Sequence, residues 1–295
     1  MTLRLDPRFP LVWRSPDSAQ LGIDRPVVTF EHVPLAEERM LYSLTLGATR
    51  GGISVVAAEA GYTELRIERF LSAVQPALLP KPQPSVTRSI TVLGTGPTAN
   101  AIATLIAESG HRPRVAGSDV GLAARKADAA IALAHFVLEP ELHGLWLRRD
   151  IPHLPVVFGD TSVRVGPLIE PGLGPCLHCL ERHRADADPA WPAIASQLLG
   201  QRGLAETAML AAEAASTAAR LVLNRFAAGR PGTATSVTID AATGERHYQA
   251  WSRHPDCGCA GVDAISATRR GTGTAAARGA VPRAPRRGAA ASVPA

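Results

Sequence analysis

The hydrophobic pattern of residues 1–80 predicts one strand followed by three short helices. Residues 27–30 (Val-Val-Thr-Phe) are β-branched and aromatic, which is typical of a strand. Apolar side chains at helical spacing indicate helices over 34–46 and 53–60, each followed by a glycine. Thr63 is a candidate N-cap for the third helix. One strand with three short helices predicts a small winged-helix-like domain.

From residue 86 onwards the pattern alternates between short apolar strands and helices. Residues 89–93 (Ser-Ile-Thr-Val-Leu) predict a buried strand, which leads through a glycine turn into a helix that ends near Ser109. The further elements predicted are strands at 114–117, 129–133, 155–158 and 164–169, helices at 139–149 and 205–228, and a hairpin of 235–239 with 245–251. This alternation predicts an α/β, Rossmann-like domain over residues 86–260. The proline-rich segment 81–85 predicts a stiff linker.

The turn after the first strand of this domain has the spacing of a dinucleotide-binding loop. Gly94 and Gly96 would allow a tight turn and the close approach of a phosphate, and Ala99 completes the fingerprint. Asp119 follows at about the distance where an acid would meet a ribose hydroxyl. Pro97, however, removes one N–H donor from the phosphate cradle. The motif is equally compatible with a Rossmann-like turn that binds no ligand.

All four cysteines of the chain stand in two short pairs. Cys176 and Cys179 form a Cys-x-x-Cys pair, and Cys257 and Cys259 form a Cys-x-Cys pair, with turn residues before each. Four thiolates delivered by two distant segments are a usual ligand set for structural zinc. The alternatives are two disulfides or four unrelated thiols, but disulfides need an oxidising compartment and the sequence shows no export signal. We therefore predict one zinc ion bound by these four cysteines.

The net charge of +5 comes from the end of the chain. Residues 261–295 contain six arginines and one acid, whereas basic and acidic residues balance over 1–260. This Ala/Gly/Pro/Arg-rich tail has almost no large apolar residue, so we predict that it is disordered. The excess charge therefore does not indicate a nucleic-acid-binding domain.

The N-terminal domain is a candidate for binding either DNA or a peptide. A DNA reader needs a basic face, but two glutamates and two arginines of the third helix cancel (Glu64, Glu68, Arg66 and Arg69). A peptide that extends the sheet beside 27–30 and contacts Leu65 and Leu71 fits better, as does a structural role. No apolar run is long enough to span a membrane, and no signal peptide is present, so we predict a cytoplasmic protein without membrane or specific nucleic-acid partners.

Taken in order, these motifs resemble a known family. The glycine turn, Asp119, the two cysteine pairs and the hairpin between them resemble the E1-like fold of ThiF, MoeB and ubiquitin-activating enzymes. Residues 5–17 and the helices after them are similar to the leader-peptide-recognition element of ocin-ThiF and cyclodehydratase proteins, which serve azole-forming (bacteriocin) peptide pathways. This resemblance implies a precursor leader peptide and a separate ATP-using YcaO-type subunit as partners. Members of the E1-like family commonly dimerise, so the resemblance is compatible with a homodimer, which the long alanine-rich helix would permit, and the oligomeric state stays open.

The chain departs from that family where ATP would bind. The resemblance implies an arginine and a lysine on the ATP phosphates and an aspartate on magnesium, but only Arg125, Lys126 and His135 stand near those places. The zinc pattern uses every cysteine, so none is left for a thioester. We therefore assign no catalytic residue and expect ATP to bind weakly or not at all. The vestigial nucleotide site would comprise Gly94, Gly96, Ala99 and Asp119.

Two hypotheses about function remain. The first is a binding protein, namely a degenerate, zinc-stabilised E1-like scaffold that presents a peptide to the YcaO-type subunit. The second is an enzyme of the ThiF/MoeB type that adenylates a C-terminal carboxylate. An NAD-dependent oxidoreductase fits less well, because it gives no reason for the four cysteines. Binding of ATP separates the first two hypotheses.

Overall fold

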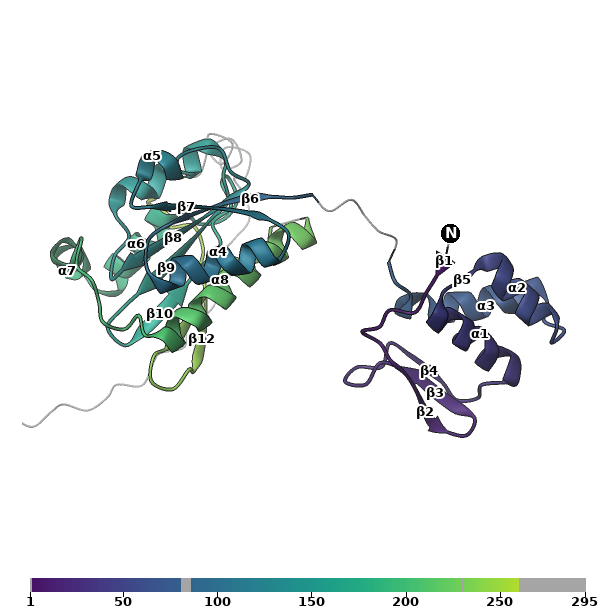
Figure 1. Ribbon diagram of the computed structural model, residues 1–295. Helices are drawn as coiled ribbons and strands as arrows, with labels where there is room; N and C mark the ends of the chain where they lie inside the picture. The colour runs from purple at the N-terminus through teal and green to yellow at the C-terminus, as the bar shows by residue number, and fades with distance from the viewer. Residues whose placement is uncertain (1, 81–85, 230, 260–295) are drawn as a thin grey trace, which may run out of the picture. The chain divides into compact units, whose positions relative to one another are not determined.

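The chain folds into two compact units (Figure 1). The structure, a computed structural model, describes residues 2–80, 86–229 and 231–259. One unit lies within Met1–Ser85 and the other within Val86–Ala295, and each contains its own hydrophobic core. The predicted linker at 81–85 and the predicted disordered tail at 261–295 lie outside the described residues.

The first unit begins with strands that the sequence analysis mostly missed. Its three-stranded antiparallel sheet has the order β2-β3-β4, formed by Leu11–Ser15, Ser18–Leu21 and Val28–Phe30. A second, smaller antiparallel pair joins β1 (Thr2–Leu3) and β5 (Ala48–Thr49). Only β4 coincides with a predicted strand. The β2–β3 hairpin turns at Pro16 and Asp17, and these turn residues were a signal that could have predicted it.

Three helices share one core with this sheet. They are α1 (Leu35–Leu46), α2 (Arg50–Ala58) and α3 (Glu64–Val74), followed by the 3-10 turn η1 (Gln75–Ala77). Leu21 of β3, Met40 of α1 and Ile53 of α2 are fully buried in that core. All three predicted helices are confirmed, but α2 begins earlier than predicted, because the Thr49 hydroxyl accepts a hydrogen bond from the Gly52 N–H (3.0 Å).

A seven-stranded mixed sheet forms the centre of the second unit, in the order β12-β11-β10-β9-β8-β6-β7. The strands are β6 (Ser89–Leu93), β7 (Arg112–Gly117), β8 (Ala129–His135), β9 (His153–Phe158), β10 (Ser162–Val165), β11 (Thr235–Asp240) and β12 (Arg246–Ala250). β7, β6, β8 and β9 run parallel, whereas β10, β11 and β12 pair antiparallel. The predicted hairpin and the predicted α/β, Rossmann-like class agree with this sheet.

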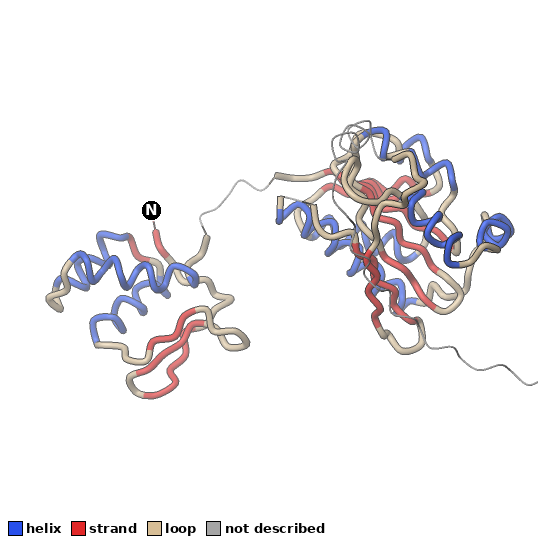
Figure 2. The backbone as a smooth tube through the Cα atoms, turned by 180° about the vertical axis from the view of Figure 1, so that it is seen from behind, coloured by secondary structure: helices blue, strands red, loops and turns tan. Residues whose placement is uncertain are grey.

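Helices cover both faces of the sheet (Figures 1 and 2). The long helices α4 (Pro97–Glu108) and α8 (Ala208–Ala228) pack against one face, where Ile131 is buried. The other face carries α5 (Val120–Ala123) and α6 (Leu177–Ala187), with Ala130 and Ala132 beneath them. Helix α7 (Trp191–Leu198) follows α6. Of the helices in the described ranges, none combines the length and the apolar character that crossing a membrane requires.

Two predicted elements are wrong. Residues 139–149 do not form one helix but two 3-10 turns, η2 (Pro140–Gly144) and η3 (Leu147–Arg149). Burial explains the misleading pattern, because Trp146 packs inward and its indole N–H donates to the Ala123 carbonyl (3.0 Å). The strand predicted over 164–169 ends at Val165, since Gly166 has φ +86° and the following proline has no N–H to donate to a sheet.

Candidate functional site

The four cysteine sulfurs converge on one point. Cys176 is the N-cap of α6 and Cys179 lies in its first turn, while Cys257 and Cys259 follow the β11–β12 hairpin. The Sγ atoms are 3.7 Å apart between Cys176 and Cys179, 3.6 Å between Cys176 and Cys257, and 3.4 Å between Cys179 and Cys259. Each pair therefore contributes sulfurs to the same cluster, as the spacing predicted.

These separations match the requirements of a tetrahedral metal ion. Zinc–sulfur bonds of about 2.3 Å place the corners of a tetrahedron about 3.8 Å apart. Every measured separation is also far longer than the about 2.05 Å of a disulfide bond, and all four thiols are free. The cluster is closed, since Cys176, Cys179 and Cys257 are buried and all four ligand atoms lie within 4.8 Å of one another. The cluster is thus suited to a structural metal.

The electrostatics of the cluster favour a central cation. Burial raises the pKa of the Cys176 thiol and, together with the neighbouring Cys179, raises that of Cys259 to about 11. Burial acts in the same direction on Cys179, but backbone hydrogen bonds from His254 and Cys176 outweigh it and lower its pKa to about 7. Four adjacent thiolates repel one another and need a cation between them.

A network of histidines and a carboxylate supports the second cysteine pair. His254, with its side chain only 3% exposed, accepts the Asp256 N–H at Nδ1 (3.1 Å), and its Nε2 lies 2.9 Å from an Asp186 carboxylate oxygen. His183 binds the Ser252 carbonyl (3.0 Å) and packs edge-on against the His254 ring. Because Nδ1 of His254 is an acceptor, Nε2 carries the proton and has no lone pair left for a metal. The network therefore positions the chain before Cys257.

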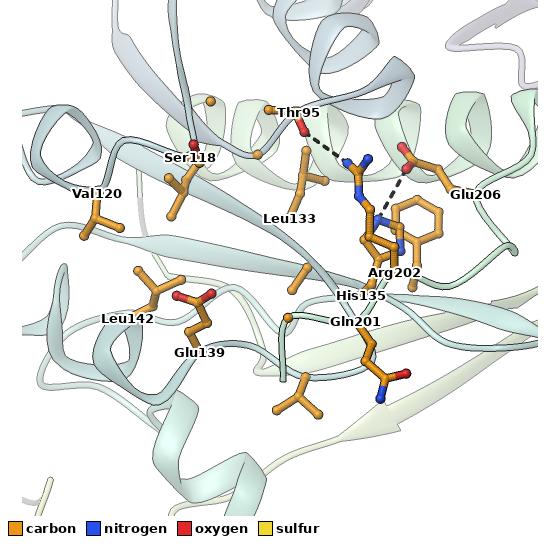
Figure 3. A pocket seen from close by; sticks show the side chains of 17 residues that line it. Thr95, Ser118, Val120, Leu133, His135, Glu139, Leu142, Gln201, Arg202 and Glu206 are labelled. Atoms are coloured by element: carbon orange, nitrogen blue, oxygen red, sulfur yellow. Dashed lines mark hydrogen bonds and ion pairs between the residues drawn. The ribbon is translucent and has the colours of Figure 1, made fainter. Parts of the chain in front are cut away.

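A second candidate site opens at the carboxyl ends of β6, β8 and β9 (Figure 3). This pocket has a volume of about 380 Å³. Its walls combine the glycine turn with the segment before α8, and its ionisable side chains are His135, Glu139, Arg202 and Glu206. In an open sheet of parallel strands, the crevice beyond the carboxyl ends is where ligands bind. We call it the strand-end pocket.

Of the four predicted nucleotide residues, Gly94 lines the strand-end pocket, whereas Gly96, Ala99 and Asp119 are not among its lining residues. Gly94 has φ +139°, and a Cβ there would stand 2.6 Å from the Leu133 Cβ, so only glycine fits. Gly96 is the N-cap of α4, and Ala99 is a buried residue in the first turn of that helix. Asp119 is exposed and does not line the pocket; its carboxylate accepts the Leu122 N–H (2.9 Å) and caps α5.

Glu206, which was not predicted from the sequence, contacts the first turn of α4. One carboxylate oxygen of Glu206 accepts hydrogen bonds from the Thr98 hydroxyl (2.6 Å) and backbone N–H (3.3 Å). The other oxygen lies 3.5 Å from His135 Nε2, and Arg202 donates to the Thr95 hydroxyl (3.1 Å; Figure 3). Burial lowers the pKa of His135, despite the nearby Glu206, so its ring is neutral at pH 7.

Comparison with known proteins identifies relatives only at the level of structure. No protein family and no curated protein matches the sequence. The heterocyclase TruD matches with a TM-score of 0.64 at 20% identity, over 94% of this chain and 45% of TruD. A heterocyclase in complex with substrate and cofactor matches at 0.62 and 16% identity, over 91% of this chain and 40% of the other. E. coli MccB with succinimide matches at 0.61 and 13% identity, over 88% of this chain and all of MccB.

These likenesses establish the fold. The chain has the fold that TruD and MccB share, which agrees with the E1-like, ThiF/MoeB-like fold expected from the motifs. It spans less than half of each heterocyclase chain but the full length of MccB. Structures of MccB include complexes with ATP and with MccA.

Proposed function

We propose that this chain is a zinc-stabilised, non-adenylating scaffold that binds the leader peptide of a precursor in an azole- or azoline-forming heterocyclase system. The observation that carries the proposal is the likeness to two heterocyclases over 94% and 91% of this chain. The match covers 45% and 40% of the two heterocyclase chains. We propose that the ATP-using step belongs to a separate YcaO-type subunit. We propose the cytoplasm as its compartment, because thiols stay reduced there.

We propose the first unit, as a winged-helix-like domain, for the peptide site. β4 lies at an edge of the three-stranded sheet, and among the described residues no strand pairs with its outer side. An extended peptide gains main-chain hydrogen bonds by adding to such an edge. Phe30 of β4 stacks on Phe70 of α3, with ring centroids 6.3 Å apart, so strand and helix are held beside each other.

Of the two leucines of α3 that we predicted to lie near the peptide, one is exposed. Leu65 is 63% exposed and is available to a peptide. Leu71 is only 9% exposed and belongs to the core, so the expectation that it contacts the peptide is wrong. Its place in the helical pattern did not distinguish the inward face from the peptide face. Arg66 stacks over the Tyr62 ring at 3.8 Å and extends the surface beyond Leu65.

The charges of α3 favour a peptide over DNA. Glu64 and Glu68 both form ion pairs with Arg50 of α2, and Arg66 lies 3.7 Å from Glu37 of α1. These pairs cancel the basic groups that would otherwise meet phosphates. This pairing supports the assignment of a peptide ligand to the unit.

The test is binding of a labelled leader peptide, encoded beside this gene, to the full-length protein, followed by fluorescence anisotropy. We expect a dissociation constant of about 1 µM, typical of a small transient interface. Leu65→Glu should weaken binding at least tenfold, because it places a charge in an apolar contact. Val55→Glu on α2 is the matched control, since Val55 is 61% exposed, and it should change the constant less than twofold. Absence of binding, or equal loss in both variants, would contradict the proposal.

The second candidate function is adenylation of a carboxylate. It is favoured by the match to the whole of MccB, a protein that has been solved with ATP. Pyrophosphate exchange with labelled pyrophosphate, dependent on a peptide carboxylate, would establish this activity and replace the scaffold proposal.

A further inference from the structure

The carboxylate of Glu206 lies where this fold places a phosphate. The N-terminus of a helix offers free N–H groups and partial positive charge, and after a glycine turn it is the usual phosphate position. At α4 that position is filled from within the chain, since Glu206 accepts both the N–H and the hydroxyl of Thr98. A Cβ at Gly96 would stand 3.4 Å from Glu206 Oε1, so the carboxylate also lies against the turn itself.

The backbone on both sides holds Glu206 in place. Ala205 before it is buried in the core, and Thr207 after it caps α8 by accepting the Leu210 N–H (3.3 Å). The Glu206 side chain is only 12% exposed, although it precedes a helix at the surface of a pocket. Its position is therefore set by the packing of α8 on α4 and not by a freely rotating side chain.

The charge balance of the strand-end pocket opposes anions. Its ionisable groups are two glutamates, one arginine and one histidine, and that histidine is neutral. Arg202 is the single permanent cation among the residues that line the pocket, and it donates to Thr95. A triphosphate would meet a net negative pocket, in which the best anion position is already taken.

We propose that Glu206 is a specificity-determining residue, an internal carboxylate that occupies the phosphate position and excludes nucleotide phosphates from the strand-end pocket. Displacing it would cost two charge-assisted hydrogen bonds, which only a better-bonded anion could replace. The inference concerns this pocket alone and does not depend on the peptide-binding proposal. It predicts that a neutral residue at 206 opens the site.

The experiment titrates the full-length protein with pyrophosphate and with Mg-ATP by calorimetry, in the wild type and in Glu206→Gln, Glu206→Ala and Glu139→Gln. Glu139 also lines the pocket but makes no hydrogen bond to α4 in the described residues, so its variant controls for net charge. We expect both Glu206 variants to bind pyrophosphate at least tenfold more tightly than the wild type, and Glu139→Gln less than threefold. Glu206→Gln keeps an oxygen that can accept the Thr98 N–H, so a loss of folding in Glu206→Ala would not obscure the result.

Three outcomes would overturn the inference. Wild type and Glu206 variants could bind equally tightly, none of the variants could gain affinity, or Glu139→Gln could gain as much as Glu206→Gln. Of these results, tight binding of Mg-ATP by the wild type is the one that would also contradict the proposal of a non-adenylating scaffold. Unchanged leader-peptide binding by Glu206→Gln would show that the two proposals stand separately.

Discussion

His153 lies at the start of β9 with one ring nitrogen bonded and the other alone. Nδ1 is 2.9 Å from the Ile151 carbonyl, whereas Nε2 is buried and has no hydrogen-bond partner among the described residues, and His153 is 1% exposed. Burial lowers the pKa of His153 to about 4. The unfolded chain takes up a proton on this histidine near pH 6.5, whereas the folded chain does not. Above pH 6.5 both states are neutral, and the free energy of unfolding is therefore undiminished there. The free energy of unfolding decreases as the pH falls from about 6.5 towards 4.

His153→Leu should therefore flatten the acid sensitivity of the second unit. The native histidine should cost about 3 kcal/mol of unfolding free energy between pH 6.5 and 4. Urea unfolding at pH 7, 5 and 4 measures this loss of unfolding free energy. His247→Leu, at an exposed position, is the control. Metal release at low pH affects all three proteins alike, so the difference between variants isolates His153. Equal losses in wild type and His153→Leu would show that this histidine does not titrate as proposed.

Individual residues differ in how far the sequence reveals them. The cysteines were identifiable, because each pair is local and the chain has no others. Glu206 was not, since its partner Thr98 is 108 positions away and no motif surrounds it. Asp119 was correctly placed after the second strand of the domain, but its carboxylate caps α5 outside the pocket, a local choice that spacing does not express.

At the scale of elements, the cysteine cluster is the joint between α6 and the β11–β12 hairpin. Cys176 and Cys179 belong to the start of the helix, and Cys257 and Cys259 to the segment after the hairpin. A metal ion there would fix the two elements to each other, and its binding energy would contribute directly to folding.

We predict one equivalent of zinc per chain in the purified protein, measured by metal analysis. Cys176→Ser should lower the zinc content at least fivefold and the free energy of unfolding by about 3 kcal/mol or more, because a ligand of a buried cluster is lost. His178→Ala is the matched control, since His178 is exposed within the same Cys-x-x-Cys segment. The prediction fails if the wild type contains no metal and all four thiols react without denaturant.

How well each helix or strand could be predicted depended on how clearly its apolar pattern and flanking turns mark it in the sequence. Strands 89–93 and 129–133 and the hairpin were recovered because β-branched or apolar runs are bounded by turns. The segment 139–149 was misassigned because inward residues three and four apart fit 3-10 turns as well as an α-helix. Helix α6 was not predicted, since its charged sequence carries almost no apolar stripe.

At the scale of the molecule, the two units have separate cores. Residues of the first core come from between Leu5 and Ala77, and those of the second from between Ile90 and Ile239. Separate cores predict separate cooperative transitions.

Calorimetric unfolding of the full chain should therefore show two transitions. Met40→Ala, at a fully buried position of α1, should lower the free energy of unfolding of the first unit by about 2–5 kcal/mol and leave that of the second unchanged. A zinc chelator should lower the transition temperature of the second unit alone. Leu46→Ala, at a position 67% exposed on the same helix, is the control and should shift neither. A single transition that moves with every treatment would mean that the units unfold together.

The position of Cys257 and Cys259 also sets an order of events during synthesis. The first unit and the parallel strands are translated long before the second cysteine pair, and domains generally fold in the order in which they are made. Cys176 and Cys179 therefore form an incomplete site with two of the four ligands until the ribosome has added Cys259. With zinc as the predicted ion, the cluster can be loaded only after Cys259 has been made, and we expect zinc supply at that moment to govern the yield of the second unit and not of the first.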